Sequence, residues 1–156
     1  IGLAFKGEDY VFGYKPKNIK KNVIWLEGRA GDRWPMKIWS HYDILEDRLR
    51  KEGFKVKIFK QRKDIRDYVA DINSCKVVVS GDSLAMHVAL ALKKKVVALF
   101  GPTNPHEIEM YGRGVKLNSN MPCISCYKKT VCETKPNCME NLSVDEVYDS
   151  IKRLLQ

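Results

Sequence analysis

Residues 77–100 constrain the fold of this chain more than any other stretch. Two short apolar runs, Val77–Val79 and Val96–Phe100, predict buried strands. Between them, Gly81–Ser83 predicts a tight turn, and Leu84–Leu92 predicts a helix that is apolar nearly all round. Strand, turn, helix and strand within about 25 residues make a β-α-β unit, whose crossover requires parallel strands. The chain is therefore expected to contain a parallel sheet covered by helices.

The residues before this unit continue the pattern. Val23–Leu26 is an apolar run that ends at Glu27–Gly28, as a buried strand would. A helix is predicted from about Trp39 to Glu52, with core positions at Ile44, Leu45 and Leu49 and a stop at Gly53. Residues 54–59 alternate between apolar side chains and lysine, which predicts a half-buried strand near a sheet edge.

Two further helices have capping signals. Asp64 is a candidate N-cap for a helix whose inner face carries Ile65, Tyr68, Val69 and Ile72. Ser143 and Glu146 form a capping box before a helix whose apolar stripe consists of Val144, Val147, Ile151 and Leu154. The expected fold class is α/β, a Rossmann-like doubly wound parallel sheet.

Length and charge set the domain organisation. The 156 residues carry 28 Lys and Arg against 19 Asp and Glu, a net charge of +9 that favours anionic partners. We expect one globular domain over residues 23–156, with a cysteine-rich loop at 119–140 and a terminal helix at 143–155. Residues 1–22 are broken by glycines and end in a basic run; they predict a linker or entry segment from an absent N-terminal domain, with a frayed terminus as the alternative.

The sequence argues against a membrane span and against secretion. The longest apolar stretch, Leu84–Leu92, contains His87 and stops at Lys93–Lys95, well short of the roughly 18 residues that a span needs. The start of the chain does not resemble a cleavable leader. Five cysteines, an odd number, argue against a complete disulfide framework. These features predict a cytoplasmic protein.

Small and polar residues follow three of the predicted strands, at Gly28–Arg33, Ser80–Ser83 and Gly101–Asn104. Ligands of open parallel sheets bind at this edge, where helix N-termini direct free N–H groups outward. The start of the Leu84 helix, with the Ser83 hydroxyl, suits a phosphate, and Arg29 and Arg33 are candidates to neutralise it. Each loop taken alone also reads as an ordinary turn, and neither a G-x-G-x-x-G nor a Walker loop is present.

His87 and the cysteines are the other candidates for chemistry. His87 follows Asp82 by five residues, so it either reaches the same cleft or is a hydrogen-bonded core residue. Cys123, Cys126, Cys132 and Cys138 lie within 16 residues. Four such thiols could hold zinc or an iron–sulfur cluster, or remain reduced, or form local disulfides. Cys75 is expected to be a small buried apolar residue.

Two segments resemble a known signature. Val77–Leu92 and Val96–Pro105 are similar to the pattern of glycosyltransferase family nine, the heptosyltransferase-like enzymes. There a strand leads into Asp-Thr/Ser-Gly-x-x-His-x-Ala, and a following apolar strand ends in Phe/Tyr-Gly-Pro-Thr. Gly28–Trp39 looks like the loop after the first strand of the family's donor domain. The resemblance covers about residues 23–156.

The resemblance implies the C-terminal, donor-binding half of a two-domain GT-B enzyme. Such enzymes transfer a heptose, often from ADP-heptose, to the lipopolysaccharide core with inversion, and require no cofactor. The implied donor-binding residues are Arg29, Arg33, Lys37, Asp82, Ser83, Leu84, His87, Gly101, Pro102 and Thr103. Asp82 would contact the sugar, Ser83 and the following amides would hold the diphosphate, and His87 would support the turn. The general base would come from the absent N-terminal domain, so the isolated chain should bind donor without turning it over.

The sequence departs from the family pattern at three places. Leu84 stands where relatives usually have Gly, and Asp32 stands where they often have Lys. The stretch between Phe59 and Val77 has room for one helix, where relatives usually fit an additional helix and strand.

Further expected partners are a lipid-linked or lipopolysaccharide-core acceptor and an anionic membrane face. The competing hypotheses are a non-catalytic metal-binding or redox module built on the cysteine loop, and a nucleic-acid-binding domain, which the scattered basic residues disfavour.

Overall fold

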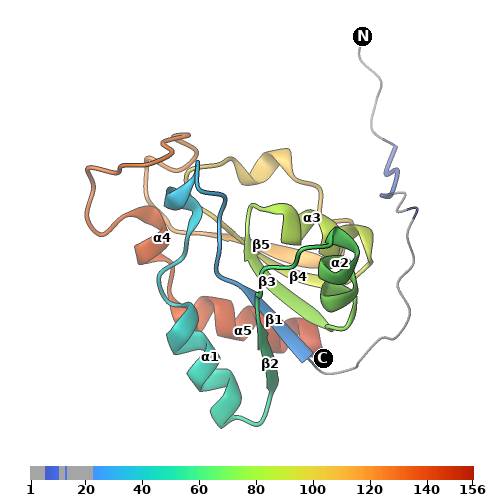
Figure 1. The fold of residues 1–156 in the computed structure, drawn as a ribbon. Helices are drawn as coiled ribbons and strands as arrows, with labels where there is room; N and C mark the ends of the chain where they lie inside the picture. Colours follow the sequence, from blue (N-terminus) through green and yellow to red (C-terminus); the bar gives the residue numbers. More distant parts are fainter. Residues whose placement is uncertain (1–5, 11–12, 14–22) are drawn as a thin grey trace.

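The computed structural model describes residues 6–10, 13 and 23–156, and its centre is a five-stranded sheet (Figure 1). The strands are β1 (Val23–Glu27), β2 (Lys55–Ile58), β3 (Val77–Gly81), β4 (Lys95–Phe100) and β5 (Gly114–Asn118), in the order β2-β1-β3-β4-β5. All four pairings are parallel. The Rossmann-like α/β prediction is confirmed, whereas the predicted entry segment, residues 1–22, lies largely outside the described residues.

Helices cover both faces of the sheet. The helices are α1 (Tyr42–Lys51), α2 (Ile65–Asn73), α3 (Leu84–Ala91), α4 (Cys138–Asn141) and α5 (Val144–Leu155). On one face α2 and α3 bury side chains such as Ile72 and Met86, and on the other α1, α4 and α5 bury Leu45, Met139 and Ile151 (Figure 1). The sheet therefore lies between two separate apolar layers, as in other doubly wound folds.

The centre of the sheet follows directly from the apolar runs. Every residue of β1 and β3 is buried, and so is every residue of β4 after Lys95. β2 is an edge strand with only Val56 buried, as the alternation with lysine predicts. The predicted caps are also present: Asp64 accepts from the backbone N–H of Arg66, and Ser143 forms a capping box with Glu146.

Several local predictions are wrong. The first long helix begins at Tyr42, not near Trp39, because the Trp39 side chain is buried and its Nε1 donates to the Leu142 carbonyl at 2.8 Å. Ile44 and Ile65 are not core residues; each is more than half exposed. Strand β5 and the one-turn helix α4 were not predicted.

No described helix is long and apolar enough to cross a membrane.

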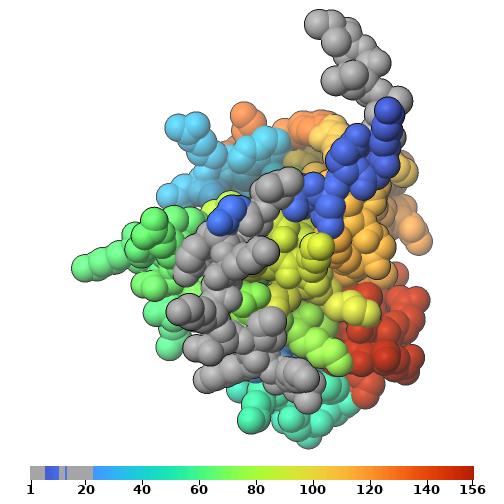
Figure 2. All heavy atoms as spheres, turned by 90° about the vertical axis from the view of Figure 1, so that its right-hand side faces the viewer, coloured from blue at the N-terminus to red at the C-terminus, as the bar shows by residue number. Residues whose placement is uncertain are grey.

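The described N-terminal residues, drawn in dark blue, lie against α3 and the segment that follows β4, drawn in yellow and gold (Figure 2). Among these residues, Asp9 pairs with Lys93 and Arg113, and the Tyr10 hydroxyl reaches His87 on α3.

Candidate donor-binding site

A cavity of about 400 Å³ opens at the carboxyl edge of the sheet. Its walls come from the loop after β1, the segment between β2 and α2, and the start of α3. The residues that line it are Glu27, Arg29, Ala30, Gly31, Phe59, Gln61, Arg62, Lys63, Asp64, Ile65, Tyr68, Ser83 and Leu84. The cavity lies where open parallel sheets bind their ligands. Three predicted residues, Arg29, Ser83 and Leu84, therefore lie in its wall.

The N-terminus of α3 borders this cavity. Ser83 is the N-cap residue, and its hydroxyl pairs with the Ser80 hydroxyl at 2.8 Å instead of capping the helix. Among the described residues, no side chain takes the cap's place. The first-turn N–H groups of α3 thus have no side-chain acceptor, which is the arrangement that binds phosphate at helix N-termini. Leu84 is 57% exposed and covers part of this approach.

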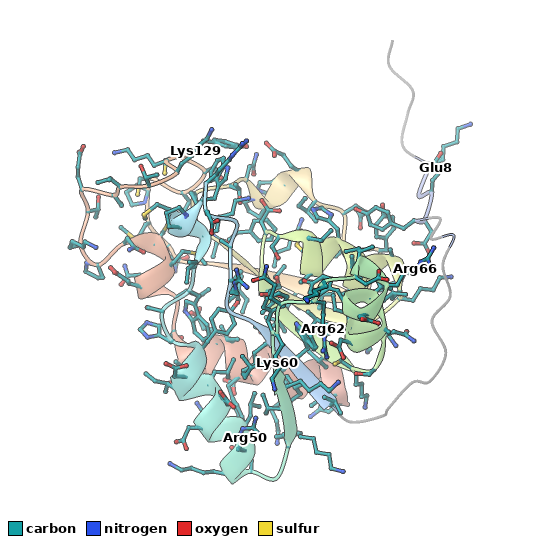
Figure 3. The ribbon with its side chains drawn as sticks, viewed as in Figure 1. Glu8, Arg50, Lys60, Arg62, Arg66 and Lys129 are labelled. Carbon is teal, nitrogen blue, oxygen red and sulfur yellow. The ribbon has the colours of Figure 1, made fainter. Side chains whose placement is uncertain are left out.

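Arg29 supplies positive charge at the cavity rim. Its guanidinium lies 5.1 Å from the centre of the Phe59 ring, and its Nη1 donates to Gln61 Oε1 at 3.3 Å. Arg62, labelled in Figure 3, lines the same cavity but forms an ion pair with Asp71 at 2.6 Å. Arg29 is exposed, its side-chain hydrogen-bond partner is neutral, and its charge also acts on the nearby Glu27 carboxyl, so it is a candidate to bind an anion in the cavity.

Glu27 is a cavity residue that the sequence analysis missed. Its side chain is 4% exposed at the end of β1. The Tyr68 hydroxyl donates to Oε2 at 3.0 Å, and the backbone N–H of Arg29 donates to Oε1 at 3.3 Å. Burial raises the pKa of this carboxyl to about 7, although both hydrogen bonds oppose the shift. The sequence signal that could have revealed Glu27 is its carboxylate, which directly follows the four apolar residues of a predicted buried strand.

Lys37, Asp82 and His87 form a linked group beside Ser83. Lys37 Nζ lies 2.8 Å from Asp82 Oδ2 and also donates to the Asp82 carbonyl at 3.1 Å. His87 Nε2 lies 3.9 Å from Asp82 Oδ1. The two members of the ion pair have side chains only 17% and 18% exposed. His87 therefore approaches Asp82 from α3, whose cap position belongs to Ser83. Lys37, Asp82 and His87 are not among the described residues that line the cavity, so their role in donor binding stays a prediction.

The remaining predicted residues lie apart from the cavity wall. Arg33 is exposed on the loop after β1, and it is not among the described residues that line the cavity. Gly101, Pro102 and Thr103 are buried beneath the cysteine-rich loop. The Gly101 carbonyl accepts from the backbone N–H of Ser125 at 3.0 Å, and the Pro102 carbonyl from that of Tyr127 at 2.7 Å. Their role in donor binding stays a prediction.

Gly101 has a structural role of its own. A Cβ at this position would lie 2.7 Å from both Cys138 Sγ and Met139 Sδ, so Gly101→Ala should force two buried side chains of α4 to move. We expect the free energy of unfolding, measured by urea denaturation, to fall by about 1–3 kcal/mol. Gly31→Ala is the matched control, since a Cβ there meets nothing within 4 Å. Equal stability of the two variants would contradict the close packing of α4 on β4.

The four clustered cysteines are free thiols and are not assembled into a metal centre. Cys123 and Cys126 are exposed, Cys132 is half-buried and Cys138 is buried. In the part of the chain that the structure describes, no group of His, Cys, Asp or Glu side chains is placed to hold a metal ion. Burial is the main cause that raises the pKa of Cys138, and the three other thiols add to the shift. Cys75 is buried, as predicted.

Comparisons with known proteins identify relatives of this chain. Residues 61–137 match the model of glycosyltransferase family 9 (heptosyltransferase). Lipooligosaccharide heptosyltransferase 2 of Campylobacter jejuni is 30% identical over 108 residues, which cover 68% of this chain and 34% of the relative. Lipopolysaccharide heptosyltransferase 1 of Pseudomonas aeruginosa is 44% identical over 62 residues, or 39% of this chain and 17% of the relative. The matched segments thus span about a third or less of these relatives.

Solved structures have the same fold. The Escherichia coli ADP-heptose lipopolysaccharide heptosyltransferase II superposes with a TM-score of 0.64 at 22% identity, over 85% of this chain and 46% of that one. The dodecameric iron-containing heptosyltransferase TibC, in complex with ADP-D-beta-D-heptose, superposes with a TM-score of 0.69 at 12% identity. This superposition covers 99% of this chain and 49% of the TibC chain. Each superposition covers somewhat less than half of the solved chain.

Proposed function

We propose that this chain, whose residues 61–137 match the model of glycosyltransferase family 9, is the nucleotide-sugar-binding half of an inverting heptosyltransferase. The observation that carries the proposal is the cavity at the carboxyl edge of the sheet, bordered by the uncapped N-terminus of α3 and by Arg29. An N-terminus of this kind and a nearby guanidinium are what a pyrophosphate requires. The favoured donor is an ADP-heptose or a similar sugar nucleotide, since one structural neighbour is a complex with ADP-D-beta-D-heptose.

The positions of the side chains suggest how the donor lies. The nucleoside would enter the cavity beside Phe59 and Tyr68, and the pyrophosphate would lie against the first-turn amides at Ser83 and Leu84. Asp82, held by Lys37, would face the sugar on the far side of Ser83. Leu84, where relatives usually have Gly, narrows the approach to these amides and is a candidate determinant of which donor is accepted.

The complete reaction is expected to need more than the segment that the relatives share with this chain, which spans about a third of their length. We propose that an N-terminal domain contributes the general base and that the acceptor is a lipid-linked or lipopolysaccharide-core glycan. With a net charge of +9, contact with the anionic inner face of the cell membrane is expected, and a cytoplasmic location follows from this role. The isolated chain should bind donor without transferring sugar, because base and acceptor are not brought to the anomeric carbon.

Calorimetric titration of ADP and of ADP-heptose into the chain tests the proposal. Saturable binding with one site is expected for both ligands, and Arg29→Ala should weaken it about tenfold or more, the loss of one charge-assisted contact. Arg153→Ala is the matched control, since Arg153 lies on α5 and bonds to Ser150. Binding that is absent from the wild type, or that responds equally to both substitutions, would contradict the proposal.

A metal-binding or redox role for the cysteine-rich loop is the second candidate. It is supported by the occurrence of four cysteines within 16 residues of one loop, and one structural neighbour is described as an iron-containing glycosyltransferase. The thiols as placed do not form a metal site, so no step of the reaction is assigned to a metal. Elemental analysis of the purified chain decides this point: one zinc or iron per chain, lost in Cys126→Ser, would support the role, and its absence would remove it.

A further inference from the structure

The described N-terminal residues are fastened to the domain by a charged contact. Both carboxylate oxygens of Asp9 accept from the guanidinium of Arg113, Oδ1 at 2.7 Å from Nη1. Lys93 Nζ lies 3.7 Å from Asp9 Oδ2. The Arg113 hydrogen bonds lower the pKa of Asp9 to about 2, so this carboxylate is charged at neutral pH. A bidentate contact of this kind fixes both the position and the orientation of the Asp9 side chain relative to Arg113.

The same contact places Tyr10 next to His87. The Tyr10 ring packs against the Tyr111 ring, with their centres 5.3 Å apart. The Tyr10 hydroxyl lies 3.1 Å from His87 Nδ1, and the two rings meet edge to face. The opposite ring nitrogen, Nε2, is the atom that faces Asp82 Oδ1. Tyr10 is thus connected to the Lys37–Asp82 ion pair through His87, by one hydrogen bond and one 3.9 Å contact.

We propose that Tyr10 is a positioning residue that acts through His87 on Asp82, the carboxylate assigned to the donor sugar. This role rests on the proposed function. When the Tyr10 hydroxyl donates to Nδ1, the imidazole keeps its proton on Nε2, the nitrogen that faces Asp82. His87 is then hydrogen-bonded to Tyr10 through one ring nitrogen and lies 3.9 Å from Asp82 Oδ1 with the other. Without Tyr10, its partly exposed ring gains rotational freedom, and Asp82 keeps only Lys37 as a neighbour of fixed position.

The proposal predicts an effect on one part of the donor only. Asp82 is assigned to the sugar, whereas the α3 amides and Arg29 are assigned to the pyrophosphate, and neither of these touches Tyr10 in the described structure. Tyr10→Phe keeps the ring packing against Tyr111 and removes only the hydroxyl. It should therefore weaken binding of ADP-heptose about threefold to tenfold and leave ADP affinity within about twofold.

The experiment is a set of calorimetric titrations with ADP and ADP-heptose. The control variant is Tyr148→Phe, which removes a hydroxyl bonded to Glu52 on the other side of the sheet and should change neither affinity. In a His87→Ala background, Tyr10→Phe should have no further effect, because the proposed connection is already broken.

The outcomes separate this role from the proposed function. A wild-type chain that binds neither ligand removes the proposed function and this role with it. If the wild type binds both ligands, the role alone is overturned when Tyr10→Phe leaves ADP-heptose affinity unchanged or weakens both ligands equally. It is also overturned when the effect of Tyr10→Phe persists in the His87→Ala background.

Discussion

Replacing Glu27 by glutamine should stabilise the protein at about pH 8 and leave its stability nearly unchanged at about pH 5. Burial raises the pKa of Glu27 to about 7 from an ordinary value of 4.5, so the folded state binds a proton that the unfolded state has already released. Stability from this group is therefore fully present below about pH 4.5 and is lost as the pH rises from there through the folded-state pKa of about 7. The raised pKa corresponds to about 3 kcal/mol at high pH.

Glutamine avoids that cost but satisfies the local hydrogen bonds less well. Glutamine has one side-chain oxygen and one NH₂ group, and the NH₂ group does not accept hydrogen bonds. One of the two donors, the Tyr68 hydroxyl or the Arg29 backbone N–H, therefore loses its acceptor, which should lower the free energy of unfolding by about 1 kcal/mol. The net change in the free energy of unfolding should be a gain of about 2 kcal/mol near pH 8 and close to zero near pH 5, where the ionisation cost and the lost hydrogen bond nearly cancel. Urea denaturation at the two pH values measures it.

The matched control for this prediction is Glu133→Gln, the same chemical change on an exposed side chain. It should alter stability by less than about 0.5 kcal/mol at either pH. A difference between Glu27→Gln and the wild type that is the same at both pH values would show that the Glu27 carboxyl does not hold a proton in the folded state.

Replacing Lys37 by methionine should weaken ADP binding about tenfold to a hundredfold. The substitution removes a positive charge beside the N-terminus of α3 and leaves the mostly buried carboxylate of Asp82 without its cation, 2.8 Å away in the intact pair. One unpaired negative charge a few ångströms from a pyrophosphate opposes binding by about 1–3 kcal/mol at the effective dielectric of a protein surface. Calorimetry gives the affinity directly.

Two variants check that explanation. Lys129 lies 5.3 Å from the centre of the Trp34 ring, the same ring that Lys37 contacts at 4.8 Å, so Lys129→Met removes the same charge from a neighbouring position. It should reduce affinity by less than about threefold. Adding Asp82→Asn to Lys37→Met should restore part of the ADP affinity, because the unpaired carboxylate is then gone. No recovery in this double variant would contradict an electrostatic cause.

The central sheet was predictable because its strands are continuous apolar runs. Val77–Val79 and Val96–Phe100 are buried on both faces, and this requirement leaves a plain signal in the sequence. Strand β5 leaves a weaker one: it lies at the edge of the sheet, has no fully buried residue and carries Lys116 at its centre. Helix α4 is a single turn whose N-cap, Asn137, is recognisable only once the start of the helix is known.

The site was predictable in its location but not in its contacts. Parallel strands bring their carboxyl ends to one edge, so the loops with Arg29 and Ser83 had to be neighbours. Whether Asp82 pairs with Lys37, 45 residues away, depends on the path of the loop after β1, which the sequence pattern does not fix. Glu27 was missed because its position in a buried strand marks it as structural, whereas its environment depends on Tyr68 from α2.

The most direct test of the account is an NMR titration of the labelled chain with ADP that follows the backbone amide chemical shifts. If the pyrophosphate binds at the N-terminus of α3, the largest shifts should occur at Ser83, Leu84 and Ala85, with smaller ones at Arg29 and Gln61. Unmoved α3 amides in the presence of saturating ADP, or largest shifts at the opposite edge of the sheet around Gly53 and Lys76, would contradict it.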